Sequence, residues 1–345
     1  MRQALPLLAL ALSGCATAPP PSLDLTGVFS PAPAATPRTG PRLELGKCVN
    51  LSNMLDAPHE GDWGRPFEDA DIARIADKGF TAIRLPARFS AHAQERPPYT
   101  IDPAFMERVA HIVDLATARG LAVIVDLHHY EEIHEDPVGH AARLAALWAQ
   151  IGRRFADAPD TVSFELLNEP TDRIVADNLL TVIGPALAEV RKTNPTRVVV
   201  IDGPLWAGLD AMLTSPFPDD RYAVPTFHYY SPVNFGFPEA DWLTPKSRDD
   251  FGRPEDLELI RADLGKVQAY IERTGRVPFV GEYGAWVTRP LPEREEFYET
   301  LSEAFASIGL DSCAWGYTNT FELWDDEKAA WRGEIADRIA APLRL

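Results

Sequence analysis

Short apolar runs recur along the chain, and most are preceded by a segment with helical periodicity. Eight of these runs have the length and β-compatible composition of buried strands. Because strands that alternate with helices are usually parallel and joined by right-handed crossovers, the pattern predicts a parallel sheet. The strands are expected at residues 45–50, 81–85, 122–126, 162–167, 198–201, 224–228, 278–281 and 313–316.

The intervening segments carry apolar residues on one helical face, as at Leu257, Ile260, Leu264 and Val267. Several of these segments end in a glycine, which is the expected left-handed stop after a last helical turn. The predicted stops are Gly79, Gly120, Gly275 and Gly309, and proline after Asn194 ends another helix.

Eight strand–helix units within residues 42–345 predict a (β/α)₈ TIM barrel as a single domain. An open doubly wound sheet is the alternative. That fold usually has a glycine-rich phosphate turn after its first strand, and residues 48–53 contain none. We therefore favour the barrel.

Polar and aromatic residues stand at the ends of the predicted strands, where a barrel holds its active site. Two strands end in glutamates, Glu169 and Glu282, and a buried carboxylate costs free energy unless something uses it. Two such residues indicate paired carboxylate chemistry. The other strand-end residues are Asn50, Arg84, His128, Asn168, Trp206, His228, Tyr230 and Trp315.

Seven motifs at these positions resemble those of glycoside hydrolase family 5, the cellulase family, in the family's order. They are N-L-S-N-M-L-D-A-P-H-E-G-D-W-G at 50–64, A-I-R-L-P at 82–86, D-L-H-H at 126–129, L-N-E-P at 167–170, F-H-Y-Y at 227–230, G-E-Y-G at 281–284 and A-W-G-Y at 314–317. The resemblance covers nearly all of residues 42–324.

The resemblance implies a retaining glycosidase in which Glu169 is the general acid/base and Glu282 the nucleophile. Asn168 is expected to hold the sugar 2-hydroxyl, and Arg84 and Tyr230 to hydrogen-bond Glu282. His128 and His228 would line the same subsite, with Trp315 as its stacking floor, while Asn50 and Trp206 would bind or support the substrate. His129 should point to the opposite face from His128 and be structural.

The expected substrate is a β-linked polysaccharide or oligosaccharide, first β-1,4-glucan and then β-mannan or β-1,3-glucan. The segment after F-H-Y-Y-S-P, V-N-F-G-F-P-E-A-D-W, departs from several relatives and leaves the glycan open. A non-catalytic carbohydrate-binding protein is the alternative from another functional class, but both glutamates with Arg84 and Tyr230 argue against it.

A catalytic metal is a further alternative, because four histidines gather between residues 128 and 140. His134 and His140 fall beyond the third strand, and no other strand end supplies a matched histidine and aspartate pair. We therefore expect no metal and no cofactor. The net charge of −18 also argues against nucleic acid as a partner. A monomer is expected.

The N-terminus predicts export and a lipid anchor. Residues 1–15 contain a short apolar run ending in L-S-G-C, which resembles the lipobox of bacterial lipoproteins and makes Cys15 the acylated residue. A cleaved secretory signal is the alternative. Residues 16–41, with seven prolines, form a tether. Alanine at position 16 favours the outer membrane of the cell envelope, on its periplasmic or surface side.

The three cysteines cannot form a disulfide framework. Cys48 and Cys313 lie on strands that become neighbours when the barrel closes, and counting by twos points both side chains inward. Export makes a disulfide thinkable. Side chains on adjacent parallel strands stand nearly parallel, however, and this geometry disfavours a bond. The expectation is two buried, reduced thiols.

Overall fold

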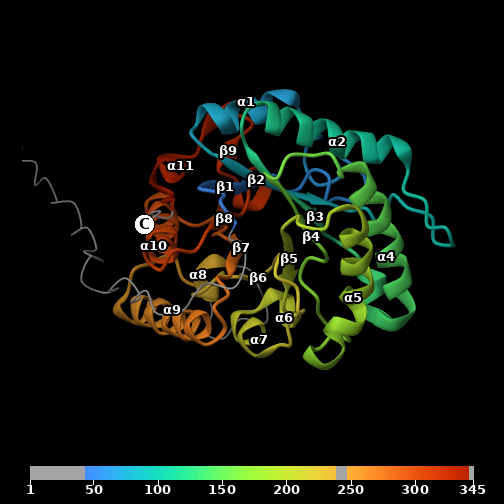
Figure 1. The fold of residues 1–345 in the computed structure, drawn as a ribbon. Coiled ribbons are helices and arrows are strands. Elements are labelled where there is room, and N and C mark those ends of the chain that lie inside the picture. Colours follow the sequence, from blue (N-terminus) through green and yellow to red (C-terminus); the bar gives the residue numbers. More distant parts are fainter. Residues whose placement is uncertain (1–42, 238–246, 342–345) are drawn as a thin grey trace, which may run out of the picture. The chain divides into compact units, whose positions relative to one another are not determined.

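The computed structural model describes residues 43–237 and 247–341. Eight parallel strands close into a barrel in chain order, which confirms the predicted (β/α)₈ fold (Figure 1). Each strand begins and ends within three residues of its expected position. The strands are β1 (Lys47–Asn50), β2 (Ala82–Ala87), β3 (Ala122–Leu127), β4 (Val162–Glu165), β5 (Val199–Asp202), β6 (Ala223–His228), β7 (Phe279–Tyr283) and β8 (Ser312–Ala314).

Helices surround the strands in Figure 1. The long ones are α1 (Asp69–Asp77), α2 (Pro103–Ala118), α4 (Pro137–Arg154), α5 (Ala176–Thr193), α9 (Pro254–Thr274) and α10 (Leu291–Ser307). Shorter elements occupy the loops: α3 (Glu131–Glu135), α6 (Pro204–Ala207), α7 (Leu209–Thr214), α8 (Val233–Gly236), η2 (Asn319–Phe321), β9 (Trp324–Asp325), β10 (Ala330–Trp331) and α11 (Ile335–Arg338).

The helix stops follow the sequence prediction. Gly275 takes a left-handed conformation directly after α9, with φ 69°. Gly79, Gly120 and Gly309 also have positive φ. Asn194 caps the end of α5 before its proline. These stops set where each chain segment enters the next strand, and so they set the register of the barrel.

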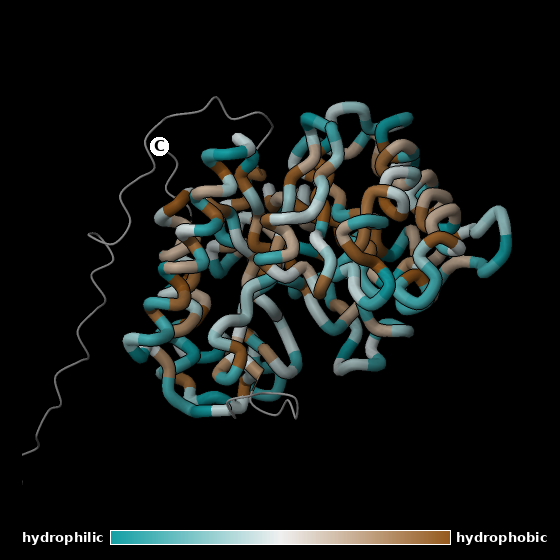
Figure 2. Tube along the Cα trace, turned by 90° about the horizontal axis from the view of Figure 1, so that it is seen from below, coloured by the Kyte–Doolittle hydropathy of each residue, from teal (hydrophilic) through white to brown (hydrophobic). Residues whose placement is uncertain are grey.

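A buried cluster of small and aliphatic side chains comes from several barrel strands, including Cys48, Ile124, Val200 and Phe279. In Figure 2, hydrophilic residues predominate along the outer turns of the helices, whereas hydrophobic stretches gather toward the middle. The polar residues of the same strands lie near the carboxyl ends of those strands, and the candidate site is there.

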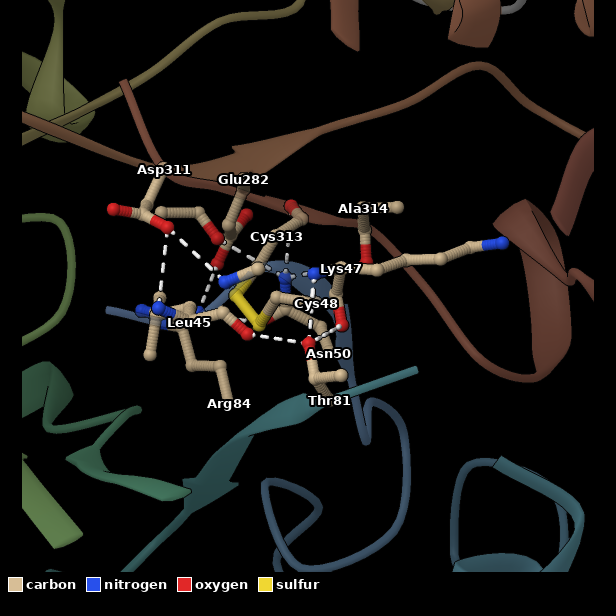
Figure 3. The surroundings of a disulfide bond; sticks show 12 residues. Leu45, Lys47, Cys48, Asn50, Thr81, Arg84, Glu282, Asp311, Cys313 and Ala314 are labelled. Carbon is tan, nitrogen blue, oxygen red and sulfur yellow. Dashed lines mark hydrogen bonds and ion pairs between the residues drawn. A yellow bond between two sulfur atoms is a disulfide. The ribbon is translucent and has the colours of Figure 1, made fainter. Parts of the chain in front are cut away.

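Cys48 and Cys313 form a disulfide, so the expectation of two reduced thiols is wrong (Figure 3). Both side chains do belong to the buried cluster, as expected. The two residues are register partners on β1 and β8, with Cα atoms 4.4 Å apart. Neighbouring strands are twisted relative to each other, so facing side chains are not strictly parallel and this separation suffices for a bond.

The predicted signal segment 1–15, the tether 16–41 and the lipidation site Cys15 lie outside the described residues. Among the helices of the described ranges, none is long and apolar enough to cross a membrane.

Candidate active site

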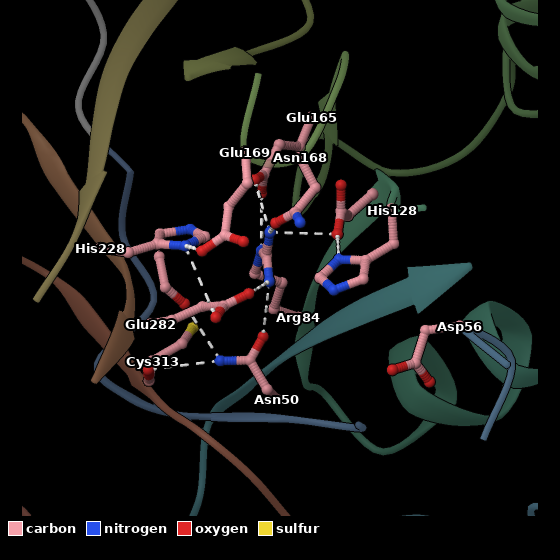
Figure 4. Close-up of polar contacts among 12 residues, drawn as sticks. Asn50, Asp56, Arg84, His128, Glu165, Asn168, Glu169, His228, Glu282 and Cys313 are labelled. Carbon is pink, nitrogen blue, oxygen red and sulfur yellow. Dashed lines mark hydrogen bonds and ion pairs between the residues drawn. The ribbon is translucent and has the colours of Figure 1, made fainter. Parts of the chain in front are cut away.

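Except for Trp206, the predicted strand-end residues converge at the carboxyl ends of the strands, and Figure 4 shows most of them. Since all eight strands are parallel, these ends open on one side of the barrel. Asn50 ends β1, Arg84 lies in β2, His228 ends β6 and Glu282 lies in β7. His128 follows β3, Asn168 and Glu169 follow β4, Tyr230 follows β6 and Trp315 follows β8.

Glu169 and Glu282 lie close together, and both approach the same ring nitrogen of His228. The Nδ1 atom of His228 is 2.7 Å from Oε1 of Glu169 and 3.5 Å from Oε2 of Glu282. One carboxylate oxygen of each glutamate and a ring nitrogen of His228 all lie within 4.8 Å of one another. This close approach suits two carboxyl groups that act in turn on one anomeric carbon, which retaining glycosidases hold about 5–5.5 Å apart.

Glu282 receives two strong hydrogen bonds. The Nη1 atom of Arg84 donates to Oε1 at 2.7 Å, and the hydroxyl of Tyr230 donates to Oε2 at 2.6 Å. Burial, reinforced by the nearby Glu169, raises the pKa of Glu282, while His228, Arg84 and Tyr230 act against this rise. These three neighbours favour the ionised form, which is the form that can attack a carbon atom.

Glu169 differs from Glu282 in both backbone and environment. Its backbone is left-handed, with φ 48°, and its side chain keeps 27% of its surface exposed. Burial raises its pKa to about 7, with Arg84 acting in the opposite direction and Glu165 reinforcing the rise. Glu169 therefore retains its proton to near-neutral pH, as a general acid requires.

Arg84 is fully buried and ties the site together. Its Nη1 atom donates to Oδ1 of Asn50 at 2.9 Å, and Nη2 donates to Oδ1 of Asn168 at 2.7 Å. The bond to Asn168 leaves that residue's amide NH₂ for another partner. The side chain of Asn50 in turn donates to the carbonyl of Gly281 at 3.0 Å, and so links β1 to β7.

Three buried carboxylates beneath the site were missed as functional residues: Asp126, Glu165 and Asp202. Arg84 binds Glu165 through two hydrogen bonds of 2.7 and 2.6 Å and lies 3.0 Å from Asp126. Burial raises the pKa of Asp126 to about 7 and that of Asp202 well above its ordinary range. The signal that could have found them was an acidic residue inside each of three apolar strands.

His128 is held between an aspartate and an indole. Its Nδ1 atom lies 2.5 Å from Oδ2 of Asp126, and its ring stacks on Trp315 with centroids 5.5 Å apart and an 8° interplanar angle. Burial lowers the pKa of His128 well below its ordinary range. A neutral imidazole bound at Nδ1 leaves Nε2 to pair with a sugar hydroxyl, which can donate or accept.

The expectation that His129 points away from His128 is wrong. The two rings meet edge to face with centroids 4.6 Å apart. β3 ends at Leu127, so the strand alternation on which the expectation rested no longer applies. Asp56 lies beside both histidines, with one side-chain oxygen or nitrogen of each residue within 4.8 Å of the others, and is a further buried polar residue that the sequence analysis did not single out.

Trp206 stands apart from the cluster. It lies in α6 after β5, where Leu205, Trp206 and Ala207 all have positive φ, and 59% of its surface is exposed. Its amide donates to the carbonyl of Pro170, next to Glu169. The backbone of Trp206 is thus joined to the segment that follows Glu169.

Three groups of acidic and histidine side chains in the described ranges bring potential metal donors within 4.8 Å. One contains Glu169, His228 and Glu282, and another contains Glu165, Asp202 and His228. The third is the Asp56 group with the two histidines after β3. The first group contains both glutamates of the pair, so a metal ion bound there would compete with carboxylate chemistry, and the second group shares His228 with it.

The sequence matches the family model described as cellulase, glycosyl hydrolase family 5, over residues 45–320. It is 30% identical over 306 residues to endoglucanase H of Acetivibrio thermocellus, covering 88% of this chain and 33% of that protein. The chain spans about a third of the length of the first curated relatives that it matches.

Solved structures of similar fold also include endoglucanases. A hyperthermophilic endo-β-1,4-glucanase in complex with substrate is 32% identical, with a TM-score of 0.82 over 86% of this chain and 96% of that one. Cel5A of Thermotoga maritima, in complex with mannotriose, is 30% identical, with a TM-score of 0.82 over 86% of this chain and 97% of that one. The same enzyme is also known in complex with cellobiose. The chain therefore belongs to the cellulase family, glycosyl hydrolase family 5.

Proposed function

We propose that this protein is a retaining glycoside hydrolase that cleaves β-linked glycans by double displacement. Glu282 attacks the anomeric carbon, and Glu169 first protonates the leaving oxygen and then activates water. The observation that carries the proposal is the pair itself: two carboxyls within 4.8 Å, one doubly hydrogen-bonded and one with a pKa of about 7.

The roles of the two glutamates can be separated by chemical rescue. Glu282→Gly should abolish turnover, and added azide should then give a glycosyl azide of inverted configuration. Glu169→Ala should lose natural substrates but still cleave aryl glycosides whose leaving group needs no proton. Equal loss on both substrate types, without an azide product, contradicts the assignment.

The pH profile gives a second test of Glu169. Its acid form is lost as pH rises through its pKa of about 7. For a natural oligosaccharide, kcat/KM should therefore fall on the alkaline side of neutrality. For a dinitrophenyl glycoside, whose leaving group needs no proton, the same fall should be much weaker. A fall of equal size for both substrates argues against Glu169 as the acid.

The substrate proposed first is β-1,4-glucan, cut internally. Similarity to endoglucanase H and to the endo-β-1,4-glucanase structure supports this choice. The measurement is reducing-sugar release from soluble β-1,4-glucan, β-mannan and β-1,3-glucan by the full chain, with Glu282→Gly as the control. A loss of viscosity that outpaces sugar release would support internal cleavage.

β-Mannan is the second candidate, because Cel5A of Thermotoga maritima is known with both mannotriose and cellobiose. The ratio of kcat/KM for cello- and manno-oligosaccharides of equal length decides between the two. A ratio above one favours the glucan, and a ratio below one favours the mannan.

The other site residues are proposed to bind the sugar. Asn168 would donate its free amide to the 2-hydroxyl, and His128 and Trp315 would line the same subsite, supported by their stacked rings. Trp206 would contact the leaving-group sugar, since its backbone joins Pro170 beside Glu169. Trp206→Ala should raise KM for long oligosaccharides more than for short ones. An equal change for both lengths argues against this role.

We also propose that the protein is a lipoprotein of the bacterial cell envelope, anchored through Cys15 to the outer membrane, and a monomer. The L-S-G-C motif and the proline-rich segment 16–41 support the anchor. Cys15→Ser should move activity from the membrane fraction to the soluble fraction of the producing cell. Wild-type protein found free in the periplasm or medium would contradict the lipid anchor. Sedimentation of the detergent-solubilised chain tests the monomer.

A further inference from the structure

Asp202, the last residue of β5, lies directly behind the acid/base Glu169 and is not among the residues that the proposed mechanism uses. Its side chain is fully buried. The Oδ2 atom of Asp202 accepts the backbone N–H of Glu169 at 3.0 Å and lies 4.0 Å from Nε2 of His228. One carboxyl thus faces both Glu169 and the histidine that contacts its side chain.

We propose that Asp202 is a positioning residue for Glu169, holding its backbone amide directly and orienting its side chain through His228. This inference rests on the proposed role of Glu169 as the acid/base.

The backbone contact matters because Glu169 has φ 48°, a conformation that side-chain-bearing residues rarely adopt. In this conformation the amide turns away from the regular strand ladder toward β5, and Oδ2 of Asp202 accepts it. Losing this acceptor removes a restraint on the turn that aims the Glu169 carboxyl at the site.

The contact through His228 depends on which ring nitrogen carries the hydrogen. Burial lowers the pKa of His228 to about 4, so the ring is neutral and has a single N–H. Nδ1 lies 2.7 Å from Oε1 of Glu169, and with the acid proton of Glu169 on Oε2, where it is free for the leaving oxygen, Oε1 is an acceptor and the ring hydrogen is needed on Nδ1. The buried Nε2 atom then has a free lone pair, and it has no hydrogen-bond partner within the described ranges.

Asp202 favours that tautomer if it carries a proton. At 4.0 Å the oxygen is too far from Nε2 for a hydrogen bond, but its charge matters: a neutral carboxyl lets the hydrogen of His228 stay on Nδ1, whereas a carboxylate would favour the hydrogen on Nε2, away from Glu169. Burial and the nearby carboxylates of Glu165 and Asp126 raise the pKa of Asp202, against the opposing effects of Arg84 and the Glu169 amide. The charged and titratable groups that face Asp202 from β2, β3, β4 and β6 are Arg84, Asp126, Glu165, Glu169 and His228.

Two substitutions test this role in the full chain. Asp202→Asn keeps an oxygen acceptor for the Glu169 amide and is neutral, as the protonated acid is. Asp202→Ala is also neutral but removes the acceptor. The substrates are cellopentaose, which needs an acid, and 2,4-dinitrophenyl β-cellobioside, which does not.

Asp202→Ala should lower kcat/KM for cellopentaose by roughly 10- to 100-fold and leave the aryl substrate within about threefold of wild type. Asp202→Asn should stay within about threefold on both substrates, with the alkaline limb of the pH profile unmoved. Equal losses of Asp202→Ala on both substrates, or an Asp202→Asn variant as impaired as Asp202→Ala, overturn the proposal.

Asp311→Ala is the matched control. Asp311 is also buried and accepts backbone amides, those of Leu45 and Gly46, but it precedes β8 at the other end of the barrel. Its replacement should affect both substrates equally. If Asp202→Ala fails to fold, Asp202→Asn decides alone. A downward shift of its alkaline limb would mean that Asp202 is ionised in the native enzyme, and the proposal would fall.

Glu169→Ala separates this inference from the proposed function. If that variant loses both substrates equally, the acid/base assignment itself fails. If Glu169→Ala loses activity only on cellopentaose, the acid/base assignment stands. If the Asp202→Ala variant then loses activity equally on both substrates, only the proposed role of Asp202 is wrong.

Discussion

Arg84 joins Glu282 of β7 to Glu165 of β4 through opposite edges of one guanidinium group. Nη1 donates to Glu282 at 2.7 Å, while Nε and Nη2 donate to Glu165 at 2.7 and 2.6 Å. A planar guanidinium can satisfy two carboxylates at fixed angles, whereas an ammonium group on a flexible stem cannot. Arg84 therefore sets the position of Glu282 as well as its charge.

Arg84→Lys should keep the buried positive charge but lose this geometry. We expect kcat/KM to fall by at least ~100-fold, comparable to the loss of an oriented charge-stabilising donor, with a smaller loss of stability. Steady-state kinetics and thermal unfolding measure the two effects. Arg197→Lys is the control, because Arg197 donates to backbone carbonyls such as those of Phe155 and Val162. A loss of activity in Arg197→Lys as large as in Arg84→Lys would contradict the positioning role.

Tyr230→Phe should shift the acidic limb of kcat/KM to higher pH. The Tyr230 hydroxyl donates to Glu282 at 2.6 Å and lowers the pKa of that carboxyl, so its removal lets the pKa rise. In the proposed mechanism Glu282 must be ionised to attack, so activity should begin to fall at a higher pH on acidification. A loss on the order of tenfold at neutral pH is also expected, since hydrogen bonds to charged groups contribute about 1.5–3 kcal/mol.

Tyr229→Phe provides the matched control for Tyr230→Phe. Tyr229 is adjacent in sequence, but its hydroxyl donates to Asp263, at 3.0 Å. Its substitution should leave the acidic limb unchanged. A limb that moves in both variants would point to a general change in the barrel.

The free energy of unfolding should decrease as pH rises from about 4 to about 7, in part because of Asp126. Burial is the main cause of its raised folded-state pKa of about 7, against an ordinary value of 3.8. Between these values the folded state holds a proton that the unfolded state has released, so raising the pH favours unfolding. Asp126→Asn, which does not titrate, should flatten this slope.

Denaturant unfolding at several pH values measures that slope. Asp77→Asn is the control, because the Asp77 side chain is 77% exposed. Its slope should match that of the wild type. An unchanged slope in Asp126→Asn would show that Asp126 is already ionised in the folded protein.

The disulfide predicts that denatured, unreduced protein takes no alkylating label at Cys48 or Cys313, and that both positions take label after reduction. Peptide mass analysis assigns the label to each position, so Cys15 does not interfere. Removing the bond by Cys48→Ala with Cys313→Ala should cost about 2–5 kcal/mol of stability. Labelling of both positions without reductant would show free thiols.

The barrel could be predicted because its strands and helix stops are local patterns. Gly275 ends a helix wherever the helix lies, and the run at 162–167, V-S-F-E-L-L, is mostly apolar whichever neighbours it has. The strand-end glutamates were visible for the same reason, since polar residues after buried strands break the pattern. Such signals need no knowledge of contacts distant in sequence.

The features that the sequence did not predict depend on contacts between residues that are distant in sequence. Asp202 gains a role only when β5 is set beside β4 in the closed barrel, and His129 turns toward Asp56 because the strand ends one residue before His128. The disulfide depends on a 4.4 Å approach between residues 265 positions apart. Alternation along one strand could not supply these distances.

The bond between Cys48 and Cys313 also changes how the barrel would bear a mechanical load. It ties the first strand to the last, so a pull applied between residues 43 and 341 passes through two sulfur atoms and bypasses the chain between them. The segments before Cys48 and after Cys313 can extend, whereas the glutamates, Arg84 and Asp202 all lie inside the closed covalent loop. In a force-extension experiment on the oxidised protein, the catalytic residues would thus stay within a loop that cannot be drawn out, and adding a reductant would release the full contour length.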